Sequence, residues 1–470
     1  MLERLEQQTR VTLNQGKIII AAILGDMLDF FDYFLIGYVL AFIVHDWNLT
    51  YGQSAVILLA AGVGGVPGAS FWGWMADKIG QRRAFIGTAL NFSIATGIMA
   101  LTPDRDWVFL TIFRLFVGFG VSGLFAVDTT LVQEYVPASK RGWVGGLVTS
   151  CLPLGLTLGA ILGRYLTPFI GWRGLFLVGL LPAALTLLIR SWVPESPRWL
   201  IRRARFEEAR QSLAWTLQVD PQEIELSTVP APEMQKTNWR EVFNYPRSVV
   251  LSILVNLSQT GGNGLLLWAT TLFVLILNVT PAEAAGLMIW ISLCGFCGRI
   301  AFSYLSDKLG RRPCGMIIGF FGALLMALAG YLHSVYIGGV SLFYLLIVAQ
   351  RFFGDASYAI IGPYSAEIWP ARLRASGMGV GYGTGNIGKI IGPLGLAVIV
   401  GTSNFVKPEA TLSAIVPALL YLAFWYGQAG VAFWLLGFET KGRSIEDIDA
   451  ALAKPTVIGT AGAAGSASVV

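Results

Sequence analysis

Charged side chains are scarce in this chain. Asp, Glu, Lys and Arg make up 13% of its 470 residues, whereas hydrophobic residues make up 55% and the mean hydropathy is +0.64. A water-soluble protein of this length needs a charged surface that such a composition does not supply. We therefore exclude a soluble globular protein and expect a chain that lies within a lipid bilayer.

Histidine and cysteine are rare as well. The two histidines, His45 and His333, have no plausible nucleophile or metal ligand near them. Among the four cysteines, Cys294 and Cys297 form a Cys-x-x-Cys pair, but it has no second pair and no nearby histidine. Helix packing explains such a pair better than a metal or redox site does. The sequence gives no reason to expect an enzyme, a cofactor or a bound metal.

No cleavable signal peptide is expected at the start of this sequence. Residues 1–17 carry charges of both signs, and the first apolar run contains three aspartates, unlike the apolar core of a signal sequence. We expect this first run to remain in the protein as a membrane-spanning helix.

The apolar residues gather in runs that are long enough to cross a hydrocarbon core, which takes about 20 helical residues. Twelve runs can be distinguished, and their even number places both termini on one side of the membrane. They lie near residues 18–44, 51–74, 84–102, 107–135, 143–168, 172–193, 247–277, 284–305, 313–332, 340–369, 375–401 and 411–436.

The lysines and arginines of the short loops are unevenly distributed. Ten lie in one alternating set of loops and three in the opposite set. The positive-inside rule places the first set of loops, both termini and the long central loop in the cytoplasm. The membrane is expected to be the cell inner (plasma) membrane. Anionic lipid beside these loops accounts for the sequence pI of about 9.0, so no nucleic-acid partner is expected. The first set is Lys78, Arg82, Arg83, Lys140, Arg141, Lys308, Arg311, Arg312, Arg372 and Arg374, and the second is Arg105, Arg173 and Lys407.

The chain divides into two related halves. The sequence Asp-Lys-Ile-Gly-Gln-Arg-Arg at 77–83 recurs as Asp-Lys-Leu-Gly-Arg-Arg at 307–312, six spans later. Such a repeat at equivalent places indicates duplication. We predict a six-helix half over 1–193, a cytoplasmic linker with an amphipathic helix over 194–246, a second six-helix half over 247–436 and a cytoplasmic tail over 437–470.

These motifs resemble those of the major facilitator superfamily over essentially the whole chain. Pro-Glu-Ser-Pro-Arg at 194–198 and Glu-Thr-Lys-Gly-Arg at 439–443 resemble the signatures that follow helices 6 and 12 in its sugar-porter-like branch. That branch also contains carriers of aromatic acids, nicotinate and other organic acids. The resemblance implies an all-α membrane protein of about twelve transmembrane helices, in two halves related by pseudo-twofold symmetry.

Charged residues at the cytoplasmic ends of the helices are candidates for gating. Asp77 and Asp307 are expected to meet the positive N-terminal end of a neighbouring helix and to latch the outward-facing state. In this branch, Glu134 with Arg141 and Glu367 with Arg372 are expected to form a cytoplasmic charge cluster. The gating candidates are Asp77, Arg82, Arg83, Glu134, Arg141, Asp307, Arg311, Arg312, Glu367 and Arg372.

Three acids in the first span are candidates for proton coupling. Asp26, Asp29 and Asp32 recur at i, i+3 and i+6, which places them along one side of a helix. Charge at this depth is costly, and three adjacent carboxylates repel one another, so at least one is expected to hold a proton or a cation. The Asp-Phe-Phe-Asp at 29–32 resembles the Asp-Gly-x-Asp of aromatic-acid/proton symporters, with Phe30 in place of Gly.

The stretch 31–37, Phe-Asp-Tyr-Phe-Leu-Ile-Gly, resembles the helix 1 segment whose Asp pairs with a helix 4 Arg in proton-coupled sugar porters. The corresponding residues here are Asp32 and Arg114. Ionised Asp32 would bind Arg114 and neutral Asp32 would release it, and each state would favour a different packing of the two helices. Asp128 is a further buried acid that is expected to face the cavity.

The residues that bind substrate are harder to predict. The sugar branch uses Gln-Gln and Gly-x-Asn in span 7, and this pattern is eroded around Gln259 and Asn263. Lys389 lies at membrane depth, where it is expected to hold a substrate carboxylate or pair with an acid. Arg299 is expected to snorkel or cap a loop, and Asp355 to lie closer to the outer surface. The substrate candidates are Phe30, Tyr33, Gln259, Asn263, Trp268, Tyr358, Tyr382, Asn386 and Lys389.

These features together favour a proton-coupled symporter that imports a small organic acid, with aromatic acids as candidates, by alternating access. A proton-linked or facilitative sugar or polyol porter fits the helix 6 and 12 signatures equally. A transport-silent membrane receptor on the same fold is a third reading. The expected partners are the small-molecule substrate, protons and the lipid bilayer, and the protein is expected to be a monomer without a cofactor.

Overall fold

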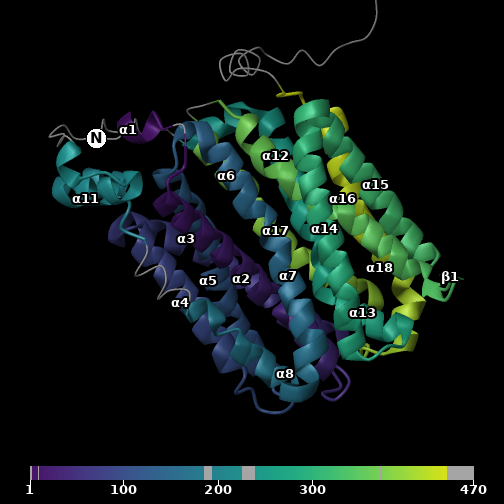
Figure 1. Ribbon diagram of the computed structural model, residues 1–470. Helices are drawn as coiled ribbons and strands as arrows, with labels where there is room; N and C mark the ends of the chain where they lie inside the picture. The colour runs from purple at the N-terminus through teal and green to yellow at the C-terminus, as the bar shows by residue number, and fades with distance from the viewer. Residues whose placement is uncertain (1–2, 9, 185–192, 225–238, 371–372, 442–470) are drawn as a thin grey trace, which may run out of the picture.

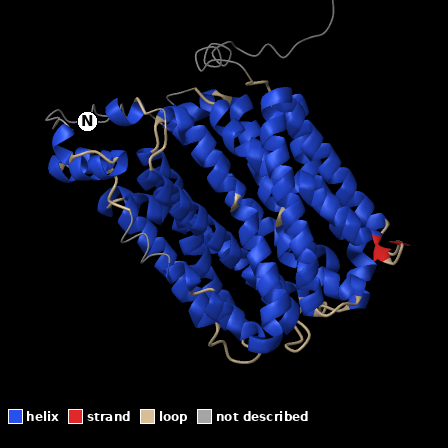
Figure 2. Cartoon of the chain, viewed as in Figure 1, coloured by secondary structure: helices blue, strands red, loops and turns tan. Residues whose placement is uncertain are grey.

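Almost the whole described chain is helical (Figure 2). The computed structural model describes residues 3–8, 10–184, 193–224, 239–370 and 373–441. Within these residues, nine helical segments are long and apolar enough to cross a bilayer. The prediction of an all-α membrane protein is therefore confirmed.

The N-terminal half contains the helices that precede residue 185. Its fifth span is broken into three pieces, α6, α7 and η1, and Gly171 with φ of 68° marks the turn before the sixth. The elements are α1 (Glu3–Glu6), α2 (Leu13–Ile43), α3 (Tyr51–Ile79), α4 (Gln81–Met99), α5 (Trp107–Tyr135), α6 (Ala138–Ser150), α7 (Leu152–Ile161), η1 (Leu162–Leu166) and α8 (Thr167–Val178).

The linker and the C-terminal half follow. The linker holds α10 (Pro197–Arg202), α11 (Phe206–Leu217), η2 (Pro221–Glu223) and η3 (Trp239–Asn244). The second half holds α12 (Pro246–Gly262), α13 (Gly264–Leu277), α14 (Pro281–Leu309), α15 (Arg311–Tyr331), α16 (Leu342–Glu367), α17 (Arg374–Val400) and α18 (Pro408–Leu435). A short antiparallel pair, β1 (Tyr336–Ile337) and β2 (Val340–Ser341), joins α15 to α16.

The duplication is visible in how the helices begin and turn. Thr50 and Thr280 close capping boxes at the starts of α3 and α14, the second helix of each half. Such caps satisfy terminal N–H groups that lipid cannot satisfy. At the other ends of these helices, Gly80 and Gly310 have φ of 103° and 104°, a conformation that favours glycine. The two repeated loops therefore share one backbone geometry.

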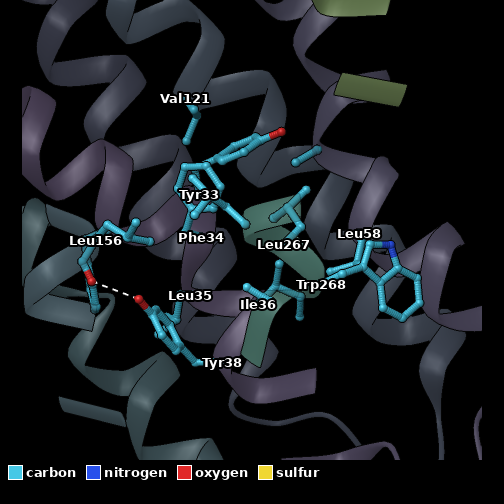
Figure 3. Packing of buried hydrophobic residues seen from close by; sticks show 14 of the residues in the cluster. Tyr33, Phe34, Leu35, Ile36, Tyr38, Leu58, Val121, Leu156, Leu267 and Trp268 are labelled. Carbon is cyan, nitrogen blue, oxygen red and sulfur yellow. Dashed lines mark hydrogen bonds between the residues drawn. The ribbon is translucent and has the colours of Figure 1, made fainter. Parts of the chain in front are cut away.

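The two halves lie side by side (Figure 1) and meet along α2 with α13, α7 with α14, and α3 with α17. Gly37 lets α2 approach α13 closely, because a Cβ at this position would lie 2.8 Å from the Leu267 carbonyl oxygen. Figure 3 shows the residues on either side, where Tyr33 and Ile36 face Leu267 and Trp268. Trp268 is fully buried and donates to the Pro393 carbonyl at 3.1 Å.

Main-chain hydrogen bonds join the halves at the N-terminal end of α3. The amides of Tyr51 and Gly52 donate to the carbonyls of Asn404 and Thr402, both at 2.9 Å. The Val406 amide returns a bond of 3.0 Å to the Leu49 carbonyl. We call this contact between residues 49–52 and 402–406 the interdomain bridge, and it holds the halves together at this end of the molecule.

The linker helices pack on the N-terminal half at the opposite end of α3. The Trp199 indole donates to the Asp77 carbonyl at 3.0 Å, and the Thr12 hydroxyl donates to the Thr216 carbonyl at 2.6 Å. The linker was expected to contain one amphipathic helix, but the segment over 197–217 forms two helices, α10 and α11. The chain turns between them because Ala204 adopts a φ of 56°.

Candidate functional site

Three buried carboxylates follow one another along α2. Asp26, Asp29 and Asp32 are all buried in the middle of the helix, as their spacing predicts. The Asp32 Oδ2 atom accepts a hydrogen bond of 2.7 Å from the Thr96 hydroxyl of α4. The Oδ1 atoms of Asp29 and Asp32 have no hydrogen-bond partner. Both side chains therefore keep an oxygen that can take up a proton.

Arg114 reaches from α5 to the same part of α2. It is fully buried, and it donates to the backbone carbonyl of Asp32 at 3.1 Å and to that of Tyr33. Its guanidinium also lies over the Tyr33 ring, 5.4 Å from the centroid. None of the Arg114 guanidinium nitrogens lies within ion-pair distance, 4.0 Å, of the Asp32 carboxylate. The structure therefore brings the two predicted residues together through the backbone, while Thr96 holds the carboxylate.

Lys389 of α17 faces α2 across the boundary between the halves. Its ammonium lies 5.6 Å from the centre of the Tyr33 ring and is attracted by Asp29, although the two charges form no direct ion pair. Gly62 of α3 makes room for it, because a Cβ at Gly62 would lie 3.1 Å from the lysine Cβ. Asn386, one turn earlier, is half-buried. The result is a cation at the interface that is not neutralised by contact.

A second polar cluster lies in the C-terminal half. Asn263, at the break between α12 and α13, donates to the Tyr358 hydroxyl at 2.5 Å and accepts from Arg351 at 3.1 Å. Arg351 and Asp355 form an ion pair on successive turns of α16. Arg299 of α14 lies 3.9 Å from the same carboxylate. The cluster therefore contains two guanidiniums and one carboxylate.

Arg299 and Asp355 are placed differently from what the sequence predicts. Arg299 does not snorkel and Asp355 does not approach the outer surface, because both are almost completely buried between helices. The cause is a close approach of α14 and α16. A Cβ at Gly298 would lie 1.9 Å from the Phe352 carbonyl oxygen. The glycines at 295 and 298 beside Arg299 were the sequence signal that could have revealed this contact.

The remaining substrate candidates are spread over several environments. Phe30 packs edge-on against Phe34 at 4.8 Å, and Gln259 is buried beside Tyr426. Tyr382 is 38% exposed. Asp128 lies in α5, but its side chain is outside the described part of the structure. The structure groups Tyr33, Lys389, Tyr358 and Asn263 near the interface more closely than the rest.

The carboxylate that accepts a hydrogen bond at the N-terminal end of α4 belongs to Glu195 and not to Asp77. Glu195 accepts from the Arg82 amide at 3.0 Å, and burial raises the pKa of this carboxyl above its ordinary value. The carboxylate of Asp77 is exposed and forms no ion pair in the described structure. Asp77 contributes its backbone carbonyl instead, to Trp199. Glu195 fills the position because the linker returns directly over the loop.

The C-terminal half repeats this arrangement. Glu439 accepts from the amides of Arg311 and Arg312 at 3.0 and 3.2 Å, at the start of α15. Asp307 does not take the expected place at the helix N-terminus; it pairs with the Arg311 side chain at 2.6 Å, and Arg311 also approaches Glu367 at 3.6 Å. Two glutamates from equivalent signatures therefore cap equivalent helices.

The expected Glu134–Arg141 pair is not formed. Arg141 pairs with Glu6 at 2.6 Å and donates to carbonyls at the end of α5, so its charge is already used. Glu134 instead lies 3.8 Å from Arg202 of the linker. Arg83 is exposed, Arg312 donates to the Trp434 carbonyl, and Arg372 lies outside the described residues.

Comparison with known proteins decides the family. The chain matches the family described as "Sugar (and other) transporter" over residues 17–452. It belongs to this family of transporters. It is therefore a multi-pass membrane transporter and not an enzyme.

Its relatives and structural neighbours agree. The chain is 29% identical over 440 residues to the niacin transporter NiaP of Acinetobacter baylyi, covering 90% of this chain and 94% of the relative. It is 26% identical over 388 residues to the cis,cis-muconate transport protein of the same organism, covering 82% and 88%. The inward-open xylose transporter XylE from E. coli superimposes with a TM-score of 0.72 at 19% identity, covering 93% and 99%. The predicted twelve-helix major facilitator fold is confirmed.

Proposed function

We propose that this transporter is a proton-coupled symporter that imports a small organic acid. The observation that carries the proposal is Lys389, a half-buried ammonium at the boundary of the halves that has no direct ion-pair partner among the described residues. A carboxylate that binds there gains a charge-assisted hydrogen bond in a setting of low dielectric. The adjacent Tyr33 ring adds an apolar and aromatic surface.

Asp29 gives this site its link to protons. Its carboxylate attracts Lys389 from the opposite half, and one oxygen is without a hydrogen bond. When Asp29 carries a proton, Lys389 is free to hold a substrate carboxylate. When the proton and the substrate leave, the ionised Asp29 attracts Lys389 again. Asp29 and Lys389 lie on different halves. Their attraction, present only when Asp29 is ionised, therefore changes the relative stability of the two arrangements of the halves.

Asp32 and Arg114 supply a second point of coupling. Arg114 now donates to two carbonyls of α2, and Thr96 holds the Asp32 carboxylate. Ionisation of Asp32 would draw the guanidinium from the carbonyls to the carboxylate. We propose that this movement shifts α2 against α5.

The names of the two relatives reported above favour an acid over a sugar. The niacin and cis,cis-muconate transporters are named for carboxylic acids or their close derivatives. The amide of Asn263, which could hold a sugar hydroxyl, is already bonded to Tyr358 and Arg351. The basic loops after α3 and α14 support a cytoplasmic location for that end of the molecule and for both termini, in a cell inner membrane.

Uptake into proteoliposomes tests the proposal. Nicotinate, benzoate and xylose are offered with and without an inward proton gradient. We expect the two acids to accumulate with the gradient only, and Lys389→Gln to abolish uptake, whereas Lys407→Gln in an exposed loop leaves it unchanged. Acid uptake that ignores the gradient, or a Lys389→Gln variant that transports normally, would contradict the proposal.

A further inference from the structure

Arg299 is a buried cation that the repeated fold does not require. It lies eight residues before Asp307, and the equivalent position in the first half, eight residues before Asp77, is Ala69. The glycines beside them, Gly68 and Gly298, both allow close helix contacts. The packing is therefore common to both halves, and the arginine is an addition to one of them.

The surroundings of Arg299 leave part of its hydrogen-bonding capacity unused. One nitrogen donates to the Thr149 carbonyl of the N-terminal half, and Asp355 lies at 3.9 Å but is already paired with Arg351. The Nε and Nη2 atoms have no hydrogen-bond partner. A buried guanidinium in this condition is costly unless an anion approaches it. The acid that faces it across the interface is Asp26, which interacts with it electrostatically.

Arg299 is connected to Lys389 through two tyrosine rings. Its guanidinium lies over the Tyr358 ring, 4.6 Å from the centroid, and the Lys389 ammonium lies 5.6 Å from the centre of the Tyr33 ring. The two tyrosines are near enough to interact electrostatically. A buried guanidinium and a half-buried ammonium thus each lie beside one ring of a pair of tyrosines, at the boundary between the halves.

We propose that Arg299 is the second anion-binding residue of the transport site, and that the preferred substrate is a small organic dianion. One carboxylate binds Lys389 and the other binds Arg299, with the apolar part of the molecule against Tyr33 and Tyr358. Ionised Asp26 competes with the second carboxylate of the substrate for Arg299, and protonated Asp26 no longer does so. This inference rests on the proposed function, which already assigns Lys389 to an acid.

Matched ligand pairs test the inference with the purified full-length protein. Terephthalate is compared with benzoate, and trans,trans-muconate with sorbate, because each pair differs chiefly by one carboxylate. Equilibrium binding to the protein in detergent gives the ratio of diacid to monoacid affinity. We expect a ratio of about ten or more, the usual effect of one added charge-assisted hydrogen bond.

Two substitutions are expected to act in opposite directions. Arg299→Gln should bring the ratio close to one and leave the monoacid affinity nearly unchanged. Asp26→Asn should raise the diacid affinity near neutral pH, because it removes the competing anion. A purely structural role for these residues would instead weaken both ligands in both variants. Arg299→Lys keeps the charge and should retain part of the ratio, so the test stands even if the glutamine variant does not fold.

The outcomes separate this inference from the proposed function. Equal affinity of the wild type for diacids and monoacids, or an unchanged ratio in Arg299→Gln, would overturn the dianion inference alone. Failure of the wild type to bind any of the four acids would overturn both.

Discussion

The interdomain bridge makes a quantitative prediction about conformational balance. The Tyr51 hydroxyl and the Thr411 Oγ1 atom lie 2.5 Å apart in the buried contact between the halves. Thr411 already donates to the Lys407 carbonyl at 2.8 Å, so Tyr51 is the donor in this pair. Alternating access requires this contact to break each time the halves separate here.

The two partners are not equivalent, and the substitutions should differ accordingly. Tyr51→Phe removes a donor and leaves the threonine satisfied, at a cost of about 1 kcal/mol, which is about a fivefold shift toward conformers open at this end. Thr411→Val leaves a buried tyrosine hydroxyl without its acceptor and should cost more, about 1–3 kcal/mol. The double variant should be less open than Thr411→Val alone, because no polar group is then left unpaired.

Spin labels on the two halves measure this balance. Asp46 and Glu409 are exposed on opposite sides of the bridge and can be replaced by cysteine, with the exposed Cys297 changed to serine. Pulsed electron resonance then gives the ratio of short to long distances in each variant. Strictly additive effects of the two substitutions, or distance distributions that do not change, would refute the reasoning.

Three further predictions follow from other parts of the structure. Burial raises the pKa of Glu195 from its ordinary value near 4.5, so the native state binds this proton more tightly than the unfolded state does. The unfolding temperature should therefore fall as pH rises through the window just above 4.5, and Glu195→Gln should remove that part of its pH dependence. A variant whose unfolding temperature follows the same pH profile as the wild type would contradict this prediction. Gly298→Ala should lower the unfolding temperature and reduce the free energy of unfolding by about 1–3 kcal/mol, because the new Cβ would lie 1.9 Å from a carbonyl oxygen of α16. The control is Gly73→Ala, where nothing lies within 4 Å of the new Cβ and no change is expected. Asp32→Asn should leave Arg114 on the carbonyls of α2 and abolish accumulation of acid driven by a proton gradient in proteoliposomes, and undiminished accumulation would exclude Asp32 from coupling.

Much of the fold was predictable from local patterns. The length of the apolar runs predicted the helices, and the repeat at 77–83 and 307–312 predicted the duplicated loops with Gly80 and Gly310 at equivalent turns. These features depend on neighbouring residues and on the thickness of the bilayer. They required no knowledge of which helices touch.

The candidate site was predictable only in part, because it depends on how distant segments meet. The spacing of Asp29 and Asp32 on one helix placed them correctly on a buried face. The exchange of Asp77 for Glu195 at the start of α4 depends on the path of the linker after residue 193. The burial of Arg299 depends on the depth at which α14 crosses α16, which a run of apolar residues does not reveal.

The proposed coupling step is the release of Lys389 by a proton on Asp29, which lets the lysine bind the substrate carboxylate. It is tested most directly by comparing exchange with accumulation in Asp29→Asn proteoliposomes, using labelled nicotinate or a diacid that the wild type transports. We expect this variant to exchange substrate at close to the wild-type rate and not to concentrate it when a proton gradient is imposed. Accumulation by Asp29→Asn to the wild-type level would contradict it.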